Sequence, residues 1–471
     1  MARNILLLIA DDLGRMTGCY GETAIRTPNI DALAASGTRF DMAFTSTASC
    51  SASRSVVYSG LHTHENGQYG LNHDHHHFIT FAHVETAPTL LGAAGYRTGI
   101  IGKVHVGPDA VYPWESREES ATRDVAWVAD RAKAFFDRAA DDTRPFFLTI
   151  GFTDPHRDWT RGGFGNDQEF DPRVERRRFA PRDVAVPSFL PDIPEVRAEL
   201  ASYYESVDRL DQGVGLVLQE LAKAGLGDET LVCFLSDNGA PFLNSKTTLY
   251  DAGIHLPLIV RAPGRKAGIA SPNLVSFTDI LPSFLDWAGH RGVSGPRRGR
   301  SLLPILEETE LLPDRQLVFG SHTFHEITNY YPTRFIRTPR YKYHRNVAWK
   351  LDFPFSGDLY GSLSWEGMRN REPVMIGRRP LKAYIERPPE ELYDLESDPE
   401  EVENLATDPS HARLLAEMRS LMEDWQRDTG DPWLYRDGIS LRAVTHHVEA
   451  GLSLPDRYDF DVDDPGNGRN G

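Results

Sequence analysis

Two pairs of oxygen-bearing residues follow short apolar runs and have the side chains that bind a hard cation. Asp11 and Asp12 follow NILLLIA. Asp237 and Asn238 follow TLVCFLS. Carboxylate and amide oxygens are preferred ligands of calcium and magnesium, and no thiolate–histidine set for zinc competes nearby. Either pair alone more often begins a turn, but two such pairs at converging strand ends predict one shared metal site.

Basic side chains suited to an anion occur at similar places along the chain. These residues are Arg54, Lys103, His105, His156 and Lys246. Each alone is ordinarily a solvated residue. Together with a cation they describe a pocket for a tetrahedral oxyanion: the positive charges neutralise it, an arginine grips two of its oxygens, and a histidine delivers a proton. One of these histidines, His156, lies two residues after Asp154 in the run that ends TDPH.

Cys50 lies among serines, in TSTASCSASRSVVYSG, rather than among apolar residues. A structural cysteine usually behaves as a small hydrophobe, so we predict that this thiol is presented and not buried. Arg54 lies four positions further on, and a helix beginning near Ser51 would put both side chains on one face. The N-terminus of that helix would also direct its partial positive charge at the same anion.

The elements that must position these residues alternate between strands and helices. Four apolar runs end abruptly in polar residues: NILLLIADD, RTGIIGKVH, PFFLTIGFTDPH and TLVCFLSDNG. Helical patterns lie between them, as in TPNIDALAASG and SYYESVDRLDQGVGLVLQELAKAGL. This order predicts an α/β fold with a large, mostly parallel sheet sandwiched by helices. Ligands of such folds bind beyond the carboxyl ends of the strands, where the polar residues above would lie.

The composition of the sequence changes at about residue 315, where runs rich in tyrosine, arginine and proline begin. The run YYPTRFIRTPRYKYHRN predicts short antiparallel strands, and HARLLAEMRSLMEDWQRD predicts a helix. We therefore predict a catalytic domain over residues 1–314. Residues 315–471 would form a smaller C-terminal α+β domain with an antiparallel sheet and the polar tail DRYDFDVDDPGNGRNG, which we expect to be ordered only where it docks.

Composition excludes several classes of partner. The net charge of −17 over 471 residues argues against nucleic acid and anionic membranes, which need a basic surface, and favours a small or chain-end substrate. No apolar run approaches the roughly 20 residues that cross a bilayer, and the opening run does not match a secretion signal. We therefore expect a cytoplasmic protein of a bacterial-type host, and leave a homo-oligomer open.

The motif CSASR resembles the C-x-P/A-x-R signature of the sulfatase family, whose cysteine is oxidised after translation to formylglycine. Further motifs are similar to the sulfamidase branch of that family, in the same order: AFTSTASCSASR, NGQYGLNHDHHHF, RTGIIGKVHVGP, VYPW, DPHR, DQGVGLVLQEL, SDNGAPF, GRSLLP, FGSHTFHEIT, ENLATDP and DPW. The resemblance implies an alkaline-phosphatase-like fold. Lys246, in NSKTTLY, departs from the arginine of animal members, which keeps the charge but changes the geometry.

The resemblance also implies a role for each candidate residue. Calcium, with magnesium as the alternative, would be held by Asp11, Asp12, Asp237, Asn238 and the formylglycine made from Cys50. That formylglycine, as a geminal diol, would be the nucleophile, and a formylglycine-generating enzyme would be a partner. Arg54 would hold the diol and the sulfate. Lys103 and Lys246 would bind sulfate oxygens, His105 would orient the diol, and His156 would protonate the leaving group.

Two histidine-bearing segments are candidates for contact with the sugar. In HDHHH, His75 and His76 would border the mouth of the pocket by resemblance, although a histidine-rich loop is more often a solvated surface. His325 and Glu326, in FHEIT, would contact glucosamine hydroxyls from the second domain. The same residues would also fit an ordinary strand pair that faces solvent.

The activity implied by the resemblance is removal of sulfate from the nitrogen of a terminal N-sulfoglucosamine. An O-sulfatase acting on another sugar or an aryl ester is a close alternative. A phosphonate or phosphate ester hydrolase of the same superfamily is another, since sulfate and phosphate share a shape. From a different class, the chain would be an inactive homologue that only binds sulfated sugars, with an intact thiol at Cys50.

Overall fold

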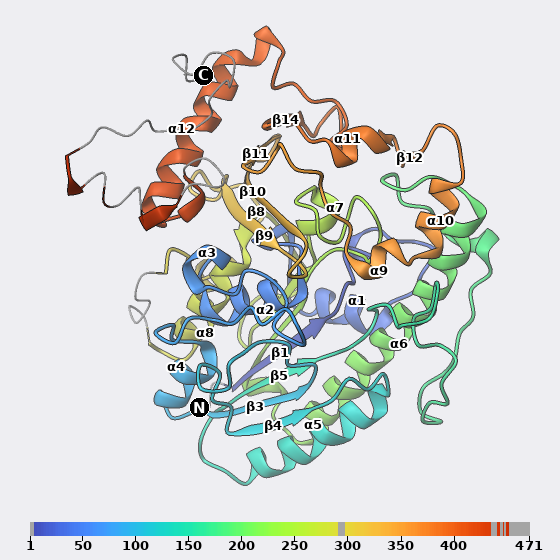
Figure 1. The fold of residues 1–471 in the computed structure, drawn as a ribbon. Helices are drawn as coiled ribbons and strands as arrows, with labels where there is room; N and C mark the ends of the chain where they lie inside the picture. The colour runs from blue at the N-terminus through green and yellow to red at the C-terminus, as the bar shows by residue number, and fades with distance from the viewer. Residues whose placement is uncertain (1–3, 291–296, 435–439, 443–445, 447–448, 452–471) are drawn as a thin grey trace.

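The computed structural model describes residues 4–290, 297–434, 440–442, 446 and 449–451, and within them an eight-stranded sheet forms the centre of the fold (Figure 1). In spatial order its strands are β4 (Ser116–Glu119), β3 (Arg97–Gly102), β5 (Phe146–Gly151), β1 (Asn4–Ala10), β6 (Thr230–Ser236), β7 (Leu258–Arg261), β2 (Thr38–Phe44) and β8 (Ile269–Ser276). Neighbouring strands are parallel except for the two pairs that β7 makes. The predicted mostly parallel sheet is confirmed.

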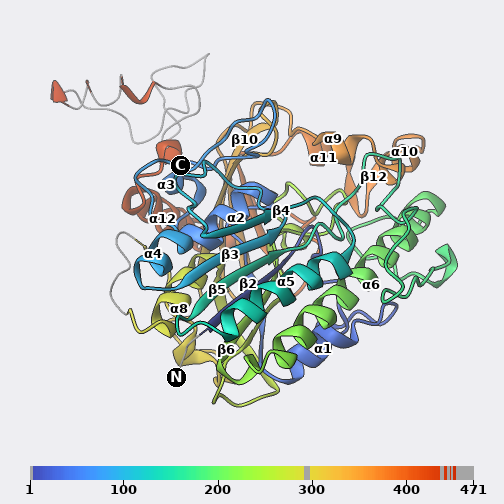
Figure 2. The same ribbon diagram turned by 90° about the horizontal axis from the view of Figure 1, so that it is seen from below.

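Helices cover both faces of this sheet (Figure 2). Leu6 and Leu8 of β1 pack into a core with α1 (Pro28–Ala35), α5 (Val125–Ala140) and α6 (Pro194–Lys223). Ile5, Leu7 and Ile9 point the other way, toward α2 (Cys50–Ser59), α4 (Ala87–Ala93) and α8 (Ile280–Trp287). A strand buried on both faces needs apolar residues at every position, which is why β1 reads as a continuous apolar run.

The four strands predicted from apolar runs are neighbours in the sheet, in the order β3-β5-β1-β6. Their carboxyl ends therefore lie side by side, and the polar residues that follow each run meet at one edge. The sequence did not predict β2, β7 and β8, which lie together at one side of the sheet. It also placed the start of the long helix late, because α6 begins at Pro194.

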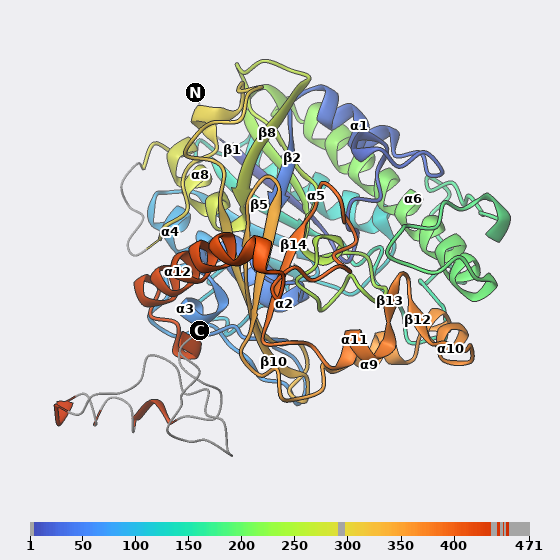
Figure 3. The same ribbon diagram turned by 90° about the horizontal axis from the view of Figure 1, so that it is seen from above.

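A second, antiparallel sheet of four strands lies among the described C-terminal residues. Its strands, in spatial order, are β14 (Glu390–Asp394), β11 (Tyr341–Asn346), β10 (Tyr330–Arg337) and β9 (Val318–Phe324). The predicted helix is α12 (Ala412–Asp428), which packs on this sheet through Leu415, Met418, Met422 and Trp425 (Figure 3). The predicted antiparallel sheet and helix are confirmed.

Short elements complete the described chain. Besides several 3-10 helices, they are the helices α3 (Thr63–Asn66), α7 (Asp251–Ile254), α9 (Gly357–Tyr360), α10 (Leu363–Arg369) and α11 (Leu381–Ile385), and the strand pair β12 (Met375–Ile376) and β13 (Arg379–Pro380). Among the described residues, no helix is both long and apolar enough to span a membrane. The domain boundary at residue 314 stays a prediction, and the polar tail, 456–471, lies outside the described residues.

Candidate functional site

The carboxyl edge of the large sheet brings the predicted polar residues together. Asp11 and Asp12 directly follow β1, and Asp237 and Asn238 directly follow β6. Lys103 and His105 follow β3, and His156 follows β5 by a short loop. The prediction that these strand ends converge is confirmed by their neighbouring places in the sheet.

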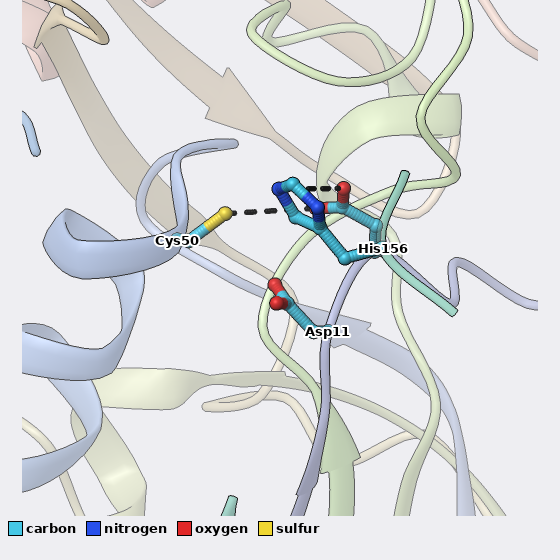
Figure 4. A group of neighbouring side chains, drawn as sticks. Asp11, Cys50 and His156 are labelled. Carbon is cyan, nitrogen blue, oxygen red and sulfur yellow. Dashed lines mark hydrogen bonds and ion pairs between the residues drawn. The ribbon is translucent and has the colours of Figure 1, made fainter. Parts of the chain in front are cut away.

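Cys50 begins α2 and its side chain points into this group of residues (Figure 4). The Sγ atom lies 3.6 Å from Asp12 Oδ1 and 3.5 Å from Asn238 Nδ2. One potential ligand atom from each of Asp11, Asp12, Cys50 and His156 lies within 4.8 Å of the others. The start of α2 and the carboxyl ends of β1, β5 and β6, which are far apart in sequence, thus come together at this site.

The prediction that the Cys50 thiol is presented was wrong. Its residue is 1% exposed, and every residue of α2 is buried. The residues around Cys50 are polar and small because they pack against buried polar groups at the start of α2, and not because they face solvent. Burial, together with the charge of Asp12, raises the pKa of the thiol well above its ordinary value. An unmodified thiol is therefore a poor nucleophile here, since the thiolate is the reactive form.

Arg54 lies one turn into α2, and its guanidinium contacts the carboxylates of Asp237 and Asp11. Its Nε donates to Asp237 Oδ2 at 2.8 Å, and its Nη1 donates to the carbonyl of Lys103 at 3.2 Å. The side chain is fully buried, and its Nη2 has no hydrogen-bond partner among the described residues. The guanidinium therefore fixes Asp237 and retains one unused donor group.

Two lysines flank the carboxylates. Lys103 pairs with Asp11, and Lys246 Nζ lies 2.8 Å from Asp12 Oδ2. Lys246 also lies 3.3 Å from His156 Nε2. Burial alone would lower the pKa of Lys246, but the charges of Asp12 and Asp358 hold it well above its ordinary value. This ammonium is therefore charged at neutral pH, as an anion-binding group must be.

The donor set fits a hard cation. Asp11 Oδ1 and Asn238 Oδ1 are buried and, within the described part of the chain, accept no hydrogen bond. Burial and the nearby charge of Asp11 raise the pKa of Asp237 to about 7, which shows that negative charge is crowded here. Unpartnered oxygens and crowded carboxylates are what a bound divalent ion compensates. The assignment of each ligand stays a prediction.

His156 is oriented by the backbone and not by Asp154. Its Nδ1 lies 2.6 Å from the carbonyl oxygen of Arg157, so Nδ1 carries the proton and Nε2 faces the site. The carboxylate of Asp154 is instead held by Arg123 and Arg209, at 2.7 and 2.6 Å. The expectation that His156 works together with Asp154 is therefore corrected. The Asp154 carboxylate binds two arginines, and the carbonyl of Arg157 orients the imidazole ring.

His105 contacts the histidine-rich loop. Its Nε2 lies 2.8 Å from Nδ1 of His73, which the sequence did not single out. In the same loop His75 is exposed, whereas His76 Nδ1 accepts a hydrogen bond from the backbone of Ile327 at 3.1 Å. Burial, followed by the charge of Lys103, lowers the pKa of His105 well below its ordinary value. The loop thus contacts the site through His73, and His76 joins it to the segment that follows β9.

The second sheet also contributes to the site. His325, just past β9, is buried and its Nδ1 lies 2.9 Å from Ser49 Oγ, at the start of α2. Glu326 Oε1 accepts a hydrogen bond from the backbone of Gly357 at 2.8 Å. His325 therefore lies in the wall of the site, and Glu326 fastens the loop beside it. Their contacts with a sugar stay predictions.

Sequence reasoning missed Asp358, in α9. Its Oδ2 lies 2.7 Å from Lys246 Nζ, which places a fourth carboxylate in the site, beside those of Asp11, Asp12 and Asp237. The surrounding letters, FSGDLY, read as an ordinary helix start, since Ser356 occupies the N-cap position. The contact joins residues 112 positions apart, and no local pattern in the sequence signals it.

Comparisons with known proteins agree with this geometry. The sulfatase family model matches residues 3–290. The chain is 42% identical over 469 residues to N-sulphoglucosamine sulphohydrolase of Homo sapiens, covering 93% of this chain and 92% of that protein. It is 30% identical to an ulvan-active sulfatase of Formosa agariphila, covering 96% and 85%.

A solved structure shares the fold. It is a protein in complex with its substrate D-glucosamine-2-N,6-O-disulfate, with a TM-score of 0.67 at 21% identity, covering 92% of this chain and 99% of that chain. The family model spans the strands that carry the site, and the human relative matches nearly the whole chain. This chain therefore belongs to the sulfatase family and is a hydrolase of sulfate esters or sulfamates.

Proposed function

We propose that this protein hydrolyses the S–N bond of a terminal N-sulfoglucosamine and releases sulfate. The observation that carries the proposal is the 42% identity to human N-sulphoglucosamine sulphohydrolase, which extends over 93% of the chain and so includes more than the family's shared site. The disulfated glucosamine bound to the structural neighbour supports a sulfated sugar as the substrate class.

The proposal includes calcium and a formylglycine at position 50. Asp11, Asp12, Asp237 and Asn238 would hold the ion, with magnesium as the alternative. When present, a hydrated aldehyde at position 50 supplies an oxygen nucleophile, and the adjacent cation neutralises sulfate oxygens. A formylglycine-generating enzyme is the partner that the modification requires. A cytoplasmic location stays a prediction.

The chain's own residues bind the sulfate and deliver a proton. Lys103 and Lys246 bind sulfate oxygens, because both ammonium groups already border the carboxylates of the site. His156 presents Nε2 on the same side as Lys246. To deliver a proton, His156 must be an imidazolium, with protons on both Nδ1 and Nε2. As the S–N bond breaks, its electron pair stays on nitrogen, the Nε2 proton moves to that nitrogen, and the sulfuryl group would pass to the oxygen nucleophile. The ring is left neutral, with its remaining proton on Nδ1 toward the Arg157 carbonyl. Without this proton an amide anion would have to leave, which is very unfavourable.

Sulfate release from defined monosaccharides tests the proposal. Protein produced together with a formylglycine-generating enzyme is incubated with N-sulfoglucosamine or with glucosamine 6-O-sulfate, and free sulfate is measured by ion chromatography. We expect turnover of the N-sulfate and little or none of the 6-O-sulfate, with no turnover by Cys50→Ala. Rapid hydrolysis of the 6-O-sulfate without hydrolysis of the N-sulfate would replace the proposal with an O-sulfatase.

A further inference from the structure

A carboxylate from outside the large sheet lies beside the predicted proton donor. Asp358 belongs to α9, which precedes α10 and is labelled in Figure 1. Its Oδ2 lies 2.7 Å from Lys246 Nζ, and the same Nζ lies 3.3 Å from His156 Nε2. One side chain therefore separates the Asp358 carboxylate from the nitrogen that would donate the proton.

The Asp358 carboxylate is held firmly in place. Its Oδ1 accepts hydrogen bonds from Ser356 Oγ at 2.6 Å and from the backbone N–H of Leu359 at 2.8 Å. The N–H of Gly357, one residue before it, donates to Glu326. Glu326 is thus part of the support for Asp358. A carboxylate fixed from several directions is preorganised to accept a hydrogen bond from a ligand.

Asp358 is charged and remains partly open. Burial would raise its pKa, but the neighbouring Lys246, His325 and His156 hold the pKa well below its ordinary value. Its side chain is 19% exposed, whereas that of Lys246 is 1% exposed. Oδ2 binds only Lys246 among the described residues and has a further lone pair, since each carboxylate oxygen has two.

We propose that Asp358 accepts a hydrogen bond from the N–H of the scissile sulfamate, and so selects a nitrogen-linked sulfate over an oxygen-linked one. The assignment rests on the proposed function, because it takes N-sulfoglucosamine as the substrate and His156 as the proton donor. Asp358 is on this view the specificity-determining residue of the site.

The chemistry of the two linkages explains why a carboxylate discriminates between them. The nitrogen of a sulfamate carries a hydrogen, which a carboxylate accepts. The bridging oxygen of a sulfate ester has only lone pairs, which repel the carboxylate. When His156 adds its proton, the nitrogen gains a second N–H and positive charge, so its attraction to Asp358 grows during the reaction. A site built around such a donor rejects the analogue that lacks it.

A pair of substrates that differ at one atom tests the proposal. N-sulfoglucosamine and glucose 2-O-sulfate carry sulfate at the same carbon, through NH or through O. In matured wild type we expect kcat/KM to favour the N-sulfate by at least about 100-fold, a lower bound on the roughly 10⁴- to 10⁵-fold rejection that a site built around a hydrogen-bond donor can give. In Asp358→Ala we expect this preference to fall below about 10-fold, through loss of turnover of the N-sulfate. Asp358→Asn, which keeps a neutral acceptor, should lie between.

Two further measurements separate selection from a structural role. Hydrolysis of 4-nitrophenyl sulfate by Asp358→Ala reports whether Lys246 still binds sulfate, and we expect it to change by less than about 5-fold. Asp251→Ala is the matched control, since Asp251 also pairs with a buried lysine, Lys342 at 2.8 Å, and is 16% exposed. We expect the N-to-O preference of this control to equal that of wild type.

Several outcomes would overturn the assignment. Equal losses on both sugar sulfates and on 4-nitrophenyl sulfate would mean that Asp358 only positions Lys246. An unchanged preference in Asp358→Ala would mean that the carboxylate does not meet the nitrogen. Absence of N-sulfate hydrolysis by matured wild type is a different result, which would contradict the proposed function and this assignment with it.

Discussion

The hydrogen bond between His156 Nδ1 and the carbonyl of Arg157 decides which ring nitrogen serves the site. Because Nδ1 donates to that carbonyl, Nε2 is the nitrogen that faces Asp12 and Lys246, at 3.7 and 3.3 Å. Arg157 itself is fastened by its ion pair with Glu199. No other side chain contacts Nδ1 of this ring among the hydrogen bonds of the described residues. Removing the His156 ring should therefore affect proton delivery more than the shape of the site.

Replacing His156 should penalise the poorer leaving group. We expect His156→Ala to lower kcat/KM for N-sulfoglucosamine by about 1000-fold, within the usual range for a lost general acid. For 4-nitrophenyl sulfate the expected loss is below about 10-fold, because a nitrophenolate leaves without a proton. Steady-state kinetics on both substrates provide the comparison. A loss of the same size on both would assign His156 to sulfate binding instead.

Removing a carboxylate should weaken cation binding directly. Asp237→Ala takes away a predicted ligand and leaves Arg54 without its 2.8 Å partner. We expect the calcium affinity to fall by roughly 100-fold, measured by isothermal titration calorimetry of metal-stripped protein. His75→Ala, at an exposed position, is the control and should bind calcium as wild type does. An unchanged affinity in Asp237→Ala would remove this residue from the ligand set.

At the scale of the elements, local sequence patterns predicted the strands that are recognisable from a continuous apolar run. The four apolar runs that end in polar residues are β1, β3, β5 and β6, and because these strands are neighbours, their polar ends form the site. The sequence missed β7, since four residues carry too little periodicity to reveal an antiparallel strand. It missed the burial of Cys50 and the place of Asp358 because both depend on contacts between distant segments.

The packing of α12 involves two buried histidines of another element. Trp425 of α12 meets the rings of His62 and His64 edge-on, with ring centroids 5.0 and 5.3 Å apart. His64 Nδ1 lies 3.1 Å from Ser321 Oγ. Burial lowers the pKa of His64 to about 4 and lowers that of His62 well below its ordinary value. Both rings are therefore neutral in the folded protein at neutral pH.

This arrangement predicts a loss of stability in mild acid. The unfolded His64 binds a proton below about pH 6.5, whereas the folded one binds it only below about pH 4, so the free energy of unfolding falls as pH drops through this window. The shift corresponds to about 3 kcal/mol from His64. Urea unfolding at several pH values measures it. In His64→Phe, which keeps an aromatic ring against Trp425, the acid loss should shrink by that amount. An identical pH profile for both proteins would contradict the account.

At the scale of the whole molecule, the two sheets share both a core and the site. One apolar cluster joins residues of the large sheet and its loops to residues of the smaller one: Phe44, Ala48, Leu249, Ile254, Leu274, Val318 and Phe335. Polar contacts cross the same junction, as in the pairs Asp251–Lys342 and Lys246–Asp358. The proposed division at residue 314 thus separates parts that share an apolar cluster and that both contribute side chains to the candidate site.

We therefore expect the chain to unfold as one cooperative unit. Differential scanning calorimetry should give a single transition, with a calorimetric enthalpy close to the van't Hoff enthalpy. A fragment of residues 1–314 should lose solubility, since it would expose the apolar residues that Val318 and Phe335 cover. Two separate transitions, or a soluble and folded fragment, would show instead that the halves are independent.

The proposed hydrolysis requires an aldehyde made from Cys50, and the amount of this aldehyde can be measured against turnover. Preparations with different extents of maturation are analysed by mass spectrometry of the peptide that contains position 50, and each is assayed with N-sulfoglucosamine. The prediction is that kcat per chain rises in proportion to the aldehyde fraction, along a line through zero, because the buried thiol of Cys50 is protonated. Full turnover of N-sulfoglucosamine by a preparation that carries only free thiol would contradict it.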